Sequence, residues 1–119
     1  MSDTVDEIQA LLDPEPRRAA GGRMLNNIPR IACVDGFSLS VQASSFNYCE
    51  PRDNYGPWDE VEVGFPSERE EKLMSFAESP EKPTDTVYVN VPIELVAEVI
   101  DDHGGIRGST HSKHRRQRH

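Results

Sequence analysis

The chain has 119 residues, of which 13 are lysine or arginine and 21 are aspartate or glutamate, so its formal net charge at pH 7 is −8. This length suits one small domain. No apolar run approaches the ~20 residues of a membrane span, and the N-terminus lacks the apolar core of a secretory signal, so we expect a cytoplasmic protein without a membrane partner. Two cysteines, Cys33 and Cys49, are too few for a disulfide framework and match no zinc-binding spacing.

The charge is unevenly distributed along the chain. Residues 1–106 hold all 21 acidic residues and 8 basic ones, a net charge of −13. Residues 107–119 carry five basic residues and no acidic one, which predicts a disordered basic tail. An acidic domain repels nucleic acid and favours a basic protein surface as partner, although its simplest role is to keep the protein soluble. Nucleic acid is therefore a candidate partner only through the tail.

The first predicted element is a short helix. Thr4 and Glu7 have the spacing of a capping box, and four apolar residues fall on one helical face: Val5, Ile8, Leu11 and Leu12. Residues 14–29 contain three prolines and two adjacent glycines, a composition typical of a linker. We therefore expect residues 1–23 to be an extension and residues 24–106 to fold alone with nearly the stability of the full chain.

Residues 30–43 predict a β-hairpin around the dipeptide Asp35-Gly36. A two-residue type I′ loop places three pairs on the core face, which are Val34 with Phe37, Ala32 with Leu39, and Arg30 with Val41. The opposite, half-solvated face then carries Ile31, Cys33, Ser38 and Ser40.

Two further strands and two helices follow. Residues 60–65 and 86–91 alternate apolar and polar side chains, with the inward positions Val61, Val63 and Phe65 in one strand and Val87, Val89 and Val91 in the other. Ser67 with Glu70 predicts a capped helix between them, ended by Pro80, and Pro92 opens a last helix that stops before Gly104. These elements predict an α+β fold: a small antiparallel sheet of about four strands with two helices packed on one face, and flexible termini.

The connection formed by residues 44–58 is the candidate interaction site. Connections of this length in a compact domain are usually functional or disordered. This one contains four of the eight aromatic residues and an isolated arginine, the composition of a binding hot spot, although rings that cover the open end of the sheet are the simpler explanation. The predicted partner-binding residues are Tyr48, Arg52, Tyr55, Trp58, Glu60 and Glu62.

Signals of catalysis are weak. The chain contains no nucleotide-binding, serine-hydrolase or zinc-protease motif. Cys33 and Cys49 are more simply packing residues, and the cluster Asp101-Asp102-His103 is more simply a solvated helix end. A domain of this size also has no core to spare for a buried cofactor. The sequence therefore predicts a protein that is not an enzyme, with no catalytic residue, no metal and no cofactor.

Three stretches resemble a group of small bacteriophage and prophage proteins: IACVDGFSLSVQAS (31–44), NYCEPRDNYGPWDEVEVGFPSE (47–68) and TDTVYVNVPIELVAEVIDDHGGI (84–106). The resemblance implies an accessory protein of the bacterial host cytoplasm that binds one host or phage protein, inhibitors of host defence systems among them. Two alternatives stay open. One is a small enzyme or nucleotide-handling protein that uses the 44–58 loop, and the other is a nucleic-acid accessory protein that acts through the basic tail.

Overall fold

The computed structural model describes residues 3–13, 28–44, 47–53 and 56–108, and the α+β prediction is confirmed. Residues 14–27 of the predicted linker (14–29) and residues 109–119 of the predicted basic tail (107–119) lie outside the described residues. In chain order the elements are helix α1 (Asp3–Leu12), strands β1 (Ile31–Ala32), β2 (Ser38–Gln42) and β3 (Glu60–Gly64), the 3-10 helix η1 (Glu71–Phe76), strand β4 (Val87–Pro92) and helix α3 (Ile93–Asp102).

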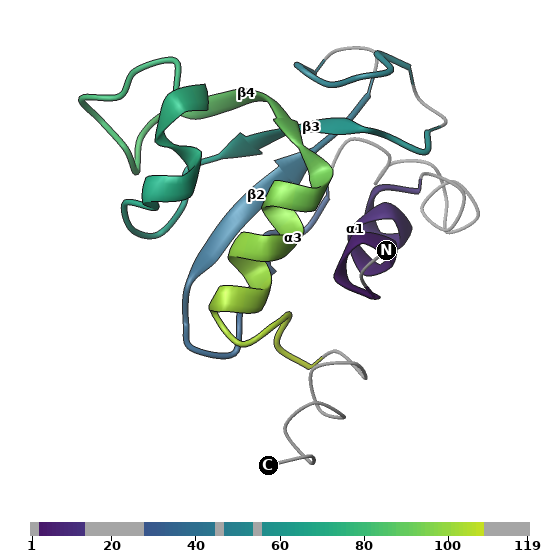
Figure 1. The fold of residues 1–119 in the computed structure, drawn as a ribbon, viewed down its shortest axis with the longest axis horizontal. Coiled ribbons are helices and arrows are strands. Elements are labelled where there is room, and N and C mark those ends of the chain that lie inside the picture. Colours follow the sequence, from purple (N-terminus) through teal and green to yellow (C-terminus); the bar gives the residue numbers. More distant parts are fainter. Residues whose placement is uncertain (1–2, 14–27, 45–46, 54–55, 109–119) are drawn as a thin grey trace.

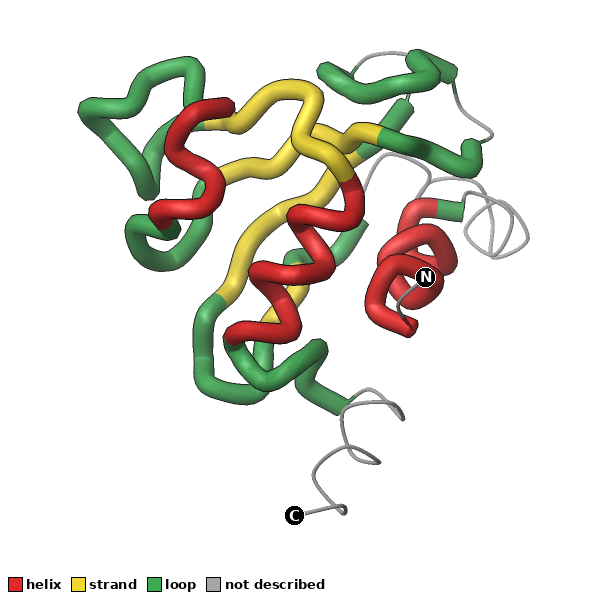
Figure 2. Tube along the Cα trace, viewed as in Figure 1, coloured by secondary structure: helices red, strands yellow, loops and turns green. Residues whose placement is uncertain are grey.

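The four strands form one antiparallel sheet with the order β1-β2-β3-β4. Helix α3 lies across one face of this sheet and α1 lies beside α3 (Figure 1). The short helix η1 packs against β4 on the other side of α3 (Figure 2). The core lies between these helices and the sheet, and its largest fully buried side chains include Tyr88, Phe37, Ile8, Leu12, Leu39, Leu73 and Ile100.

The β1–β2 hairpin forms, but its register differs from the predicted one by a single residue. Ile31 pairs with Leu39 and Ala32 with Ser38. The N–H of Cys33 donates to the carbonyl of Phe37 at 2.7 Å, so the loop between them contains three residues, 34–36. The predicted two-residue type I′ loop is therefore wrong.

The slipped register exchanges the two faces of β1. Cys33 and Ile31 point into the core, whereas the predicted core residues Val34 and Arg30 are half-buried and exposed, respectively. Gly36 closes the loop with a φ of +100°, a conformation that favours glycine and that ends three-residue hairpin loops. Because side chains alternate along a strand, one added loop residue is enough to turn every side chain of the preceding strand over.

Replacing Gly36 by valine should destabilise the fold through backbone strain alone. A Cβ atom at Gly36 meets nothing within 4 Å, so no clash contributes. The positive φ of a β-branched residue should cost about 1–3 kcal/mol in the free energy of unfolding, measured by urea denaturation. Gly36→Asn is the matched control, since asparagine tolerates this conformation better. Equal losses in both variants would contradict a backbone origin.

At the end of β3 the predicted alternation fails. Val61 and Val63 are fully buried as predicted, but Phe65 is 46% exposed. Phe65 has a φ of +49°, which is rare outside glycine, and β3 ends at the residue before it. Its ring consequently leaves the core side to which simple alternation assigned it.

A β-bulge changes the pattern in β4. Of the three valines predicted to point inward, Val87 and Val89 are only half-buried and Val91 is fully buried. Tyr88 is fully buried in their place. The register against β3 shifts by one residue within the strand, where Asn90 has a φ of +51°. Such a bulge re-aims the side chains on either side of it.

The helix predicted after Ser67 is shorter than expected and starts later. Glu70 is the N-cap of η1, and its carboxylate accepts a hydrogen bond from the N–H of Lys72 at 3.2 Å. The hydroxyl of Ser67 instead accepts from the N–H of Ser38 at 2.9 Å, so it satisfies the end of β2 and caps no helix. Only Leu73 of η1 is fully buried.

Helix α3 forms as predicted and leads into a segment that extends the sheet. The chain turns at Gly104 and Gly105, which have φ values of +91° and +88°. Beyond the turn, the N–H of Val34 bonds the carbonyl of Gly105 at 3.0 Å, and the N–H of Arg107 bonds that of Ala32 at 2.8 Å. The C-terminal segment therefore covers the outer edge of β1.

The N-terminal helix is an integral part of the core. Val5, Ile8 and Leu12 of α1 are buried in the same cluster as the sheet and α3. Thr4 lies within the helix and its hydroxyl donates to the carboxylate of Asp101 at 2.5 Å, so it does not act as the predicted cap. This packing removes the basis for expecting residues 24–106 to be as stable as the full chain.

Candidate functional site

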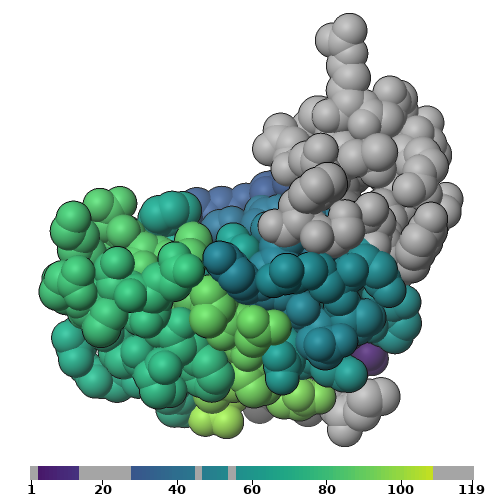
Figure 3. Space-filling view, turned by 90° about the horizontal axis from the view of Figure 1, so that it is seen from above, coloured from purple at the N-terminus to yellow at the C-terminus, as the bar shows by residue number. Residues whose placement is uncertain are grey.

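Tyr48 is an exposed aromatic residue on a fixed backbone. Its N–H donates to the carboxylate of Glu62 in β3 at 3.0 Å, and its carbonyl accepts from the N–H of Asn90 in β4 at 3.1 Å. The side chain is nevertheless 43% exposed. In the view from above, the blue-teal atoms of this part of the chain lie at the surface beside lighter green atoms of the later chain (Figure 3). The bulge in β4 places the N–H of Asn90 outside the β3–β4 pairing, and this N–H binds the loop instead.

Arg52 stacks on this tyrosine. Its guanidinium carbon lies 5.4 Å from the centre of the Tyr48 ring, within the range of a cation–π contact. Its Nε donates to the carbonyl of Asn47 at 3.1 Å, and the residue is exposed. The structure therefore brings two of the predicted partner-binding residues together at the surface.

The two predicted glutamates of β3 differ in their surroundings. Glu62 is half-buried and its carboxylate also lies 3.4 Å from the Asn47 side-chain nitrogen, so it holds the loop. Glu60 is half-buried and pairs through its backbone with Glu50, whose N–H donates to the Glu60 carbonyl at 3.0 Å. Glu50 and the neighbouring Asp59 are exposed, so acidic side chains flank the loop.

Trp58 is a core residue, which corrects its assignment as a partner-binding residue. It is 2% exposed. Its backbone N–H and carbonyl bond the side-chain amide of Gln9 in α1 at 3.1 and 2.7 Å, so it joins the loop to the N-terminal helix. The indole fills the end of the core, as small domains with few aromatics require. Tyr55, the remaining predicted contact, lies outside the described residues.

Neither cysteine is placed as a nucleophile. Burial raises the pKa of Cys33 to about 11, with a further contribution from the charge of Asp35. Burial also raises the pKa of Cys49, whose thiol donates to the carbonyl of Ser44 at 3.1 Å. Reactive cysteines have lowered pKa values and accessible sulfur atoms, so these two thiols are suited to packing.

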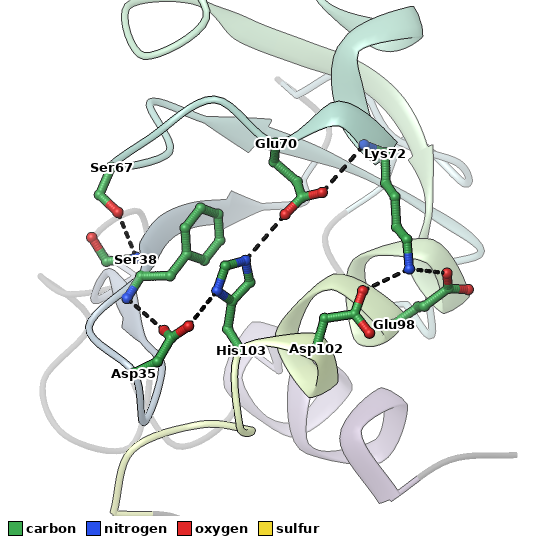
Figure 4. A network of polar contacts seen from close by, with 9 residues as sticks. Asp35, Ser38, Ser67, Glu70, Lys72, Glu98, Asp102 and His103 are labelled. Carbon is green, nitrogen blue, oxygen red and sulfur yellow. Dashed lines mark hydrogen bonds and ion pairs between the residues drawn. The ribbon is translucent and has the colours of Figure 1, made fainter.

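His103 forms a polar cluster that sequence reasoning missed. Its Nδ1 lies 2.6 Å from the Asp35 carboxylate in the hairpin loop, and its Nε2 lies 3.1 Å from the Glu70 carboxylate before η1 (Figure 4). Its ring stacks on Phe37 with 4.0 Å between centroids. The interpretation of Asp101, Asp102 and His103 as a solvated helix end is therefore wrong for His103, whose side chain is only 17% exposed and whose partners lie 33 and 68 residues away in the chain, whereas Asp101 and Asp102 are exposed.

The cluster favours the protonated imidazole. Partial burial lowers the pKa of His103, but the hydrogen bonds and charges of Asp35 and Glu70 outweigh it and raise the pKa above the usual 6.5. Both ring nitrogens are engaged by carboxylates, so neither is available as a general base. Beside it, Lys72 forms ion pairs with Glu98 at 2.5 Å and Asp102 at 2.6 Å (Figure 4). These exposed pairs tie η1 to α3 weakly.

Among the described residues, no group of three or more His, Cys, Asp and Glu side chains is arranged to hold a metal ion. No helix within the same residues has the length and apolar character needed to cross a bilayer. No protein-family model, curated protein or solved structure shows a significant match to this chain.

Proposed function

We propose that this chain is a phage-type accessory protein of the bacterial cytoplasm that acts by binding a basic protein surface and catalyses no reaction. Antagonism of a host defence system is one form that such binding takes. The observation that carries the proposal is Tyr48: an exposed aromatic side chain whose backbone is held on both sides and whose ring is stacked by Arg52. Aromatic and arginine residues dominate the energetics of protein interfaces, and a fixed backbone reduces the entropy lost on binding.

The charge of the surface supports a basic partner. Many exposed carboxylates take part in none of the ion pairs found between described residues, among them Glu50, Asp59, Glu68, Glu78, Glu81, Asp85 and Glu94. Such a field steers a positively charged protein toward the surface. On this account the acidic side chains govern the association rate, and Tyr48 with Arg52 governs the dissociation rate.

Binding kinetics of the purified partner should separate these two contributions. Tyr48→Ala should raise the dissociation rate by an amount equivalent to about 2 kcal/mol or more, as expected for a hot spot. The association rate of the wild-type chain should fall steeply between about 0.05 and about 0.3 M salt, because salt screens exposed charges.

Phe65→Ala is the matched control for this measurement, since Phe65 is exposed to a similar extent and lies just beyond the C-terminal end of β3. It should bind as the wild type does. If Tyr48→Ala also binds like the wild type, the proposed contact surface is wrong. A partner whose association rate does not change with salt would argue against a basic surface.

A further inference from the structure

His103 connects three segments that are distant in sequence. It follows the last residue of α3, and its two ring nitrogens face Asp35 of the hairpin loop and Glu70 before η1. Each of these carboxylates is already held by the backbone: Asp35 accepts from the N–H of Phe37 at 2.9 Å, and Glu70 accepts from that of Lys72 at 3.2 Å. The imidazole therefore lies between two acceptors whose positions are fixed independently of it (Figure 4).

Two carboxylates on opposite ring nitrogens require two N–H donors. A neutral imidazole has one N–H and one lone pair, whereas the imidazolium has two N–H groups. After loss of a proton, one of the two carboxylates would face a nitrogen lone pair, and that contact would become repulsive. The arrangement is complete only when His103 is charged.

The same contact controls how the C-terminal segment meets the hairpin. The N–H of Asp35 donates to the carbonyl of His103 at 3.2 Å, and the N–H of Val34 donates to that of Gly105 at 3.0 Å. Both bonds join the hairpin loop to residues 103–105. The side-chain cluster and this short backbone ladder therefore lie next to each other and brace the same junction.

We propose that His103 is a proton-operated clasp, which holds the hairpin loop and the start of η1 against the end of α3 when charged and loosens this junction when neutral. Its charged neighbours are Asp35 on the hairpin and Glu70 before η1, whereas the nearby Lys72 is paired with Glu98 and Asp102 of α3. These are the charged groups of the packed elements that set its proton affinity.

The direction of the pH dependence follows from the charges. Because the pKa of His103 is raised in the folded state, protonation stabilises the junction fully below the ordinary value of 6.5, and this stabilisation is lost as the pH rises through the raised value. The hydrogen bond from the Phe37 N–H and the contact with His103 both lower the pKa of Asp35, so that carboxylate stays charged throughout this range. The clasp thus closes toward acid pH and opens toward alkaline pH.

A histidine titration by NMR on the full chain tests the clasp. His103→Gln assigns the resonance among those of the four histidines. We expect the midpoint of His103 to lie above 6.5, and Asp35→Asn and Glu70→Gln each to lower it. A midpoint at or below 6.5, or one that neither substitution moves, would overturn the proposal.

Amide hydrogen exchange supplies a second readout. Protection of the Val34 and Asp35 amides, corrected for intrinsic exchange, should fall in the wild type between about pH 5.5 and about pH 8.5. The fall should approach tenfold for each unit by which the pKa of His103 is raised. In Glu70→Gln the fall should be smaller. Equal protection at both pH values in the wild type would show that the junction does not respond to the proton.

Discussion

A chain that begins at Met24 should be less stable than the full chain by about 3 kcal/mol or more, with the loss measured by urea denaturation. Deletion of α1 removes Val5, Ile8 and Leu12 from the core and uncovers the α3 surface on which they pack. Truncating a single buried leucine or isoleucine to alanine costs about 2–5 kcal/mol. The conformational entropy that the ten-residue helix loses on ordering opposes its docking, so the net loss is smaller than three such truncations.

Point variants of the full chain keep this prediction testable even if the shortened chain does not fold. Ile8→Ala should destabilise by about 2–5 kcal/mol, whereas Asp6→Ala on the exposed side of the same helix should change stability by less than about 0.5 kcal/mol. If Ile8→Ala is as stable as Asp6→Ala, α1 does not belong to the core in solution.

Trp58→Ala should destabilise the fold by about 3–5 kcal/mol, the range typical of a buried aromatic truncated to alanine. The indole is buried, and a Cβ atom at Gly56 would lie 2.6 Å from two of its ring carbons. Its removal would also leave Gln9, which bonds the Trp58 backbone, beside a cavity. The loss should appear as a lower urea midpoint.

Trp58→Phe is the control for this second prediction. The Nε1 of Trp58 is buried and has no hydrogen-bond partner within the described structure, so loss of the N–H itself should not be costly. Phenylalanine keeps most of the ring contacts and should cost less than alanine. If Trp58→Ala is as stable as the wild type but fails to bind a partner, the assignment of Trp58 to the core is wrong and Trp58 belongs to the contact surface.

Local patterns in the sequence were sufficient for the existence and order of most elements. The apolar spacing of residues 5–12, the Asp35-Gly36 turn signal and the alternation in residues 60–64 depend on neighbouring residues, and each marks an element that forms. Faces and registers were less predictable. A three-residue loop and a bulge near Asn90 each shift the pattern by one residue, and nothing in the local sequence distinguishes them from the regular alternatives.

The candidate site was predictable in composition but not in geometry. The 44–58 loop indicated an aromatic and arginine surface, and the structure places Tyr48 and Arg52 there. The inward position of Trp58 depends on α1, because the side chain of Gln9 bonds the Trp58 backbone. The sequence of the loop alone does not show which of its rings is buried. The His103 cluster depends on contacts between residues far apart in the chain, so no local pattern could reveal it.

Quantitative capture from bacterial lysate tests the central claim most directly. The wild-type chain, Tyr48→Ala and Phe65→Ala are immobilised in equal amounts, and bound proteins and nucleic acid are quantified after a low-salt and a high-salt wash. The account predicts one stoichiometric basic protein that is retained by the wild type and Phe65→Ala, is lost from Tyr48→Ala, and elutes with salt. Equal retention by all three chains, or retention of nucleic acid alone, would contradict a protein-binding function at Tyr48.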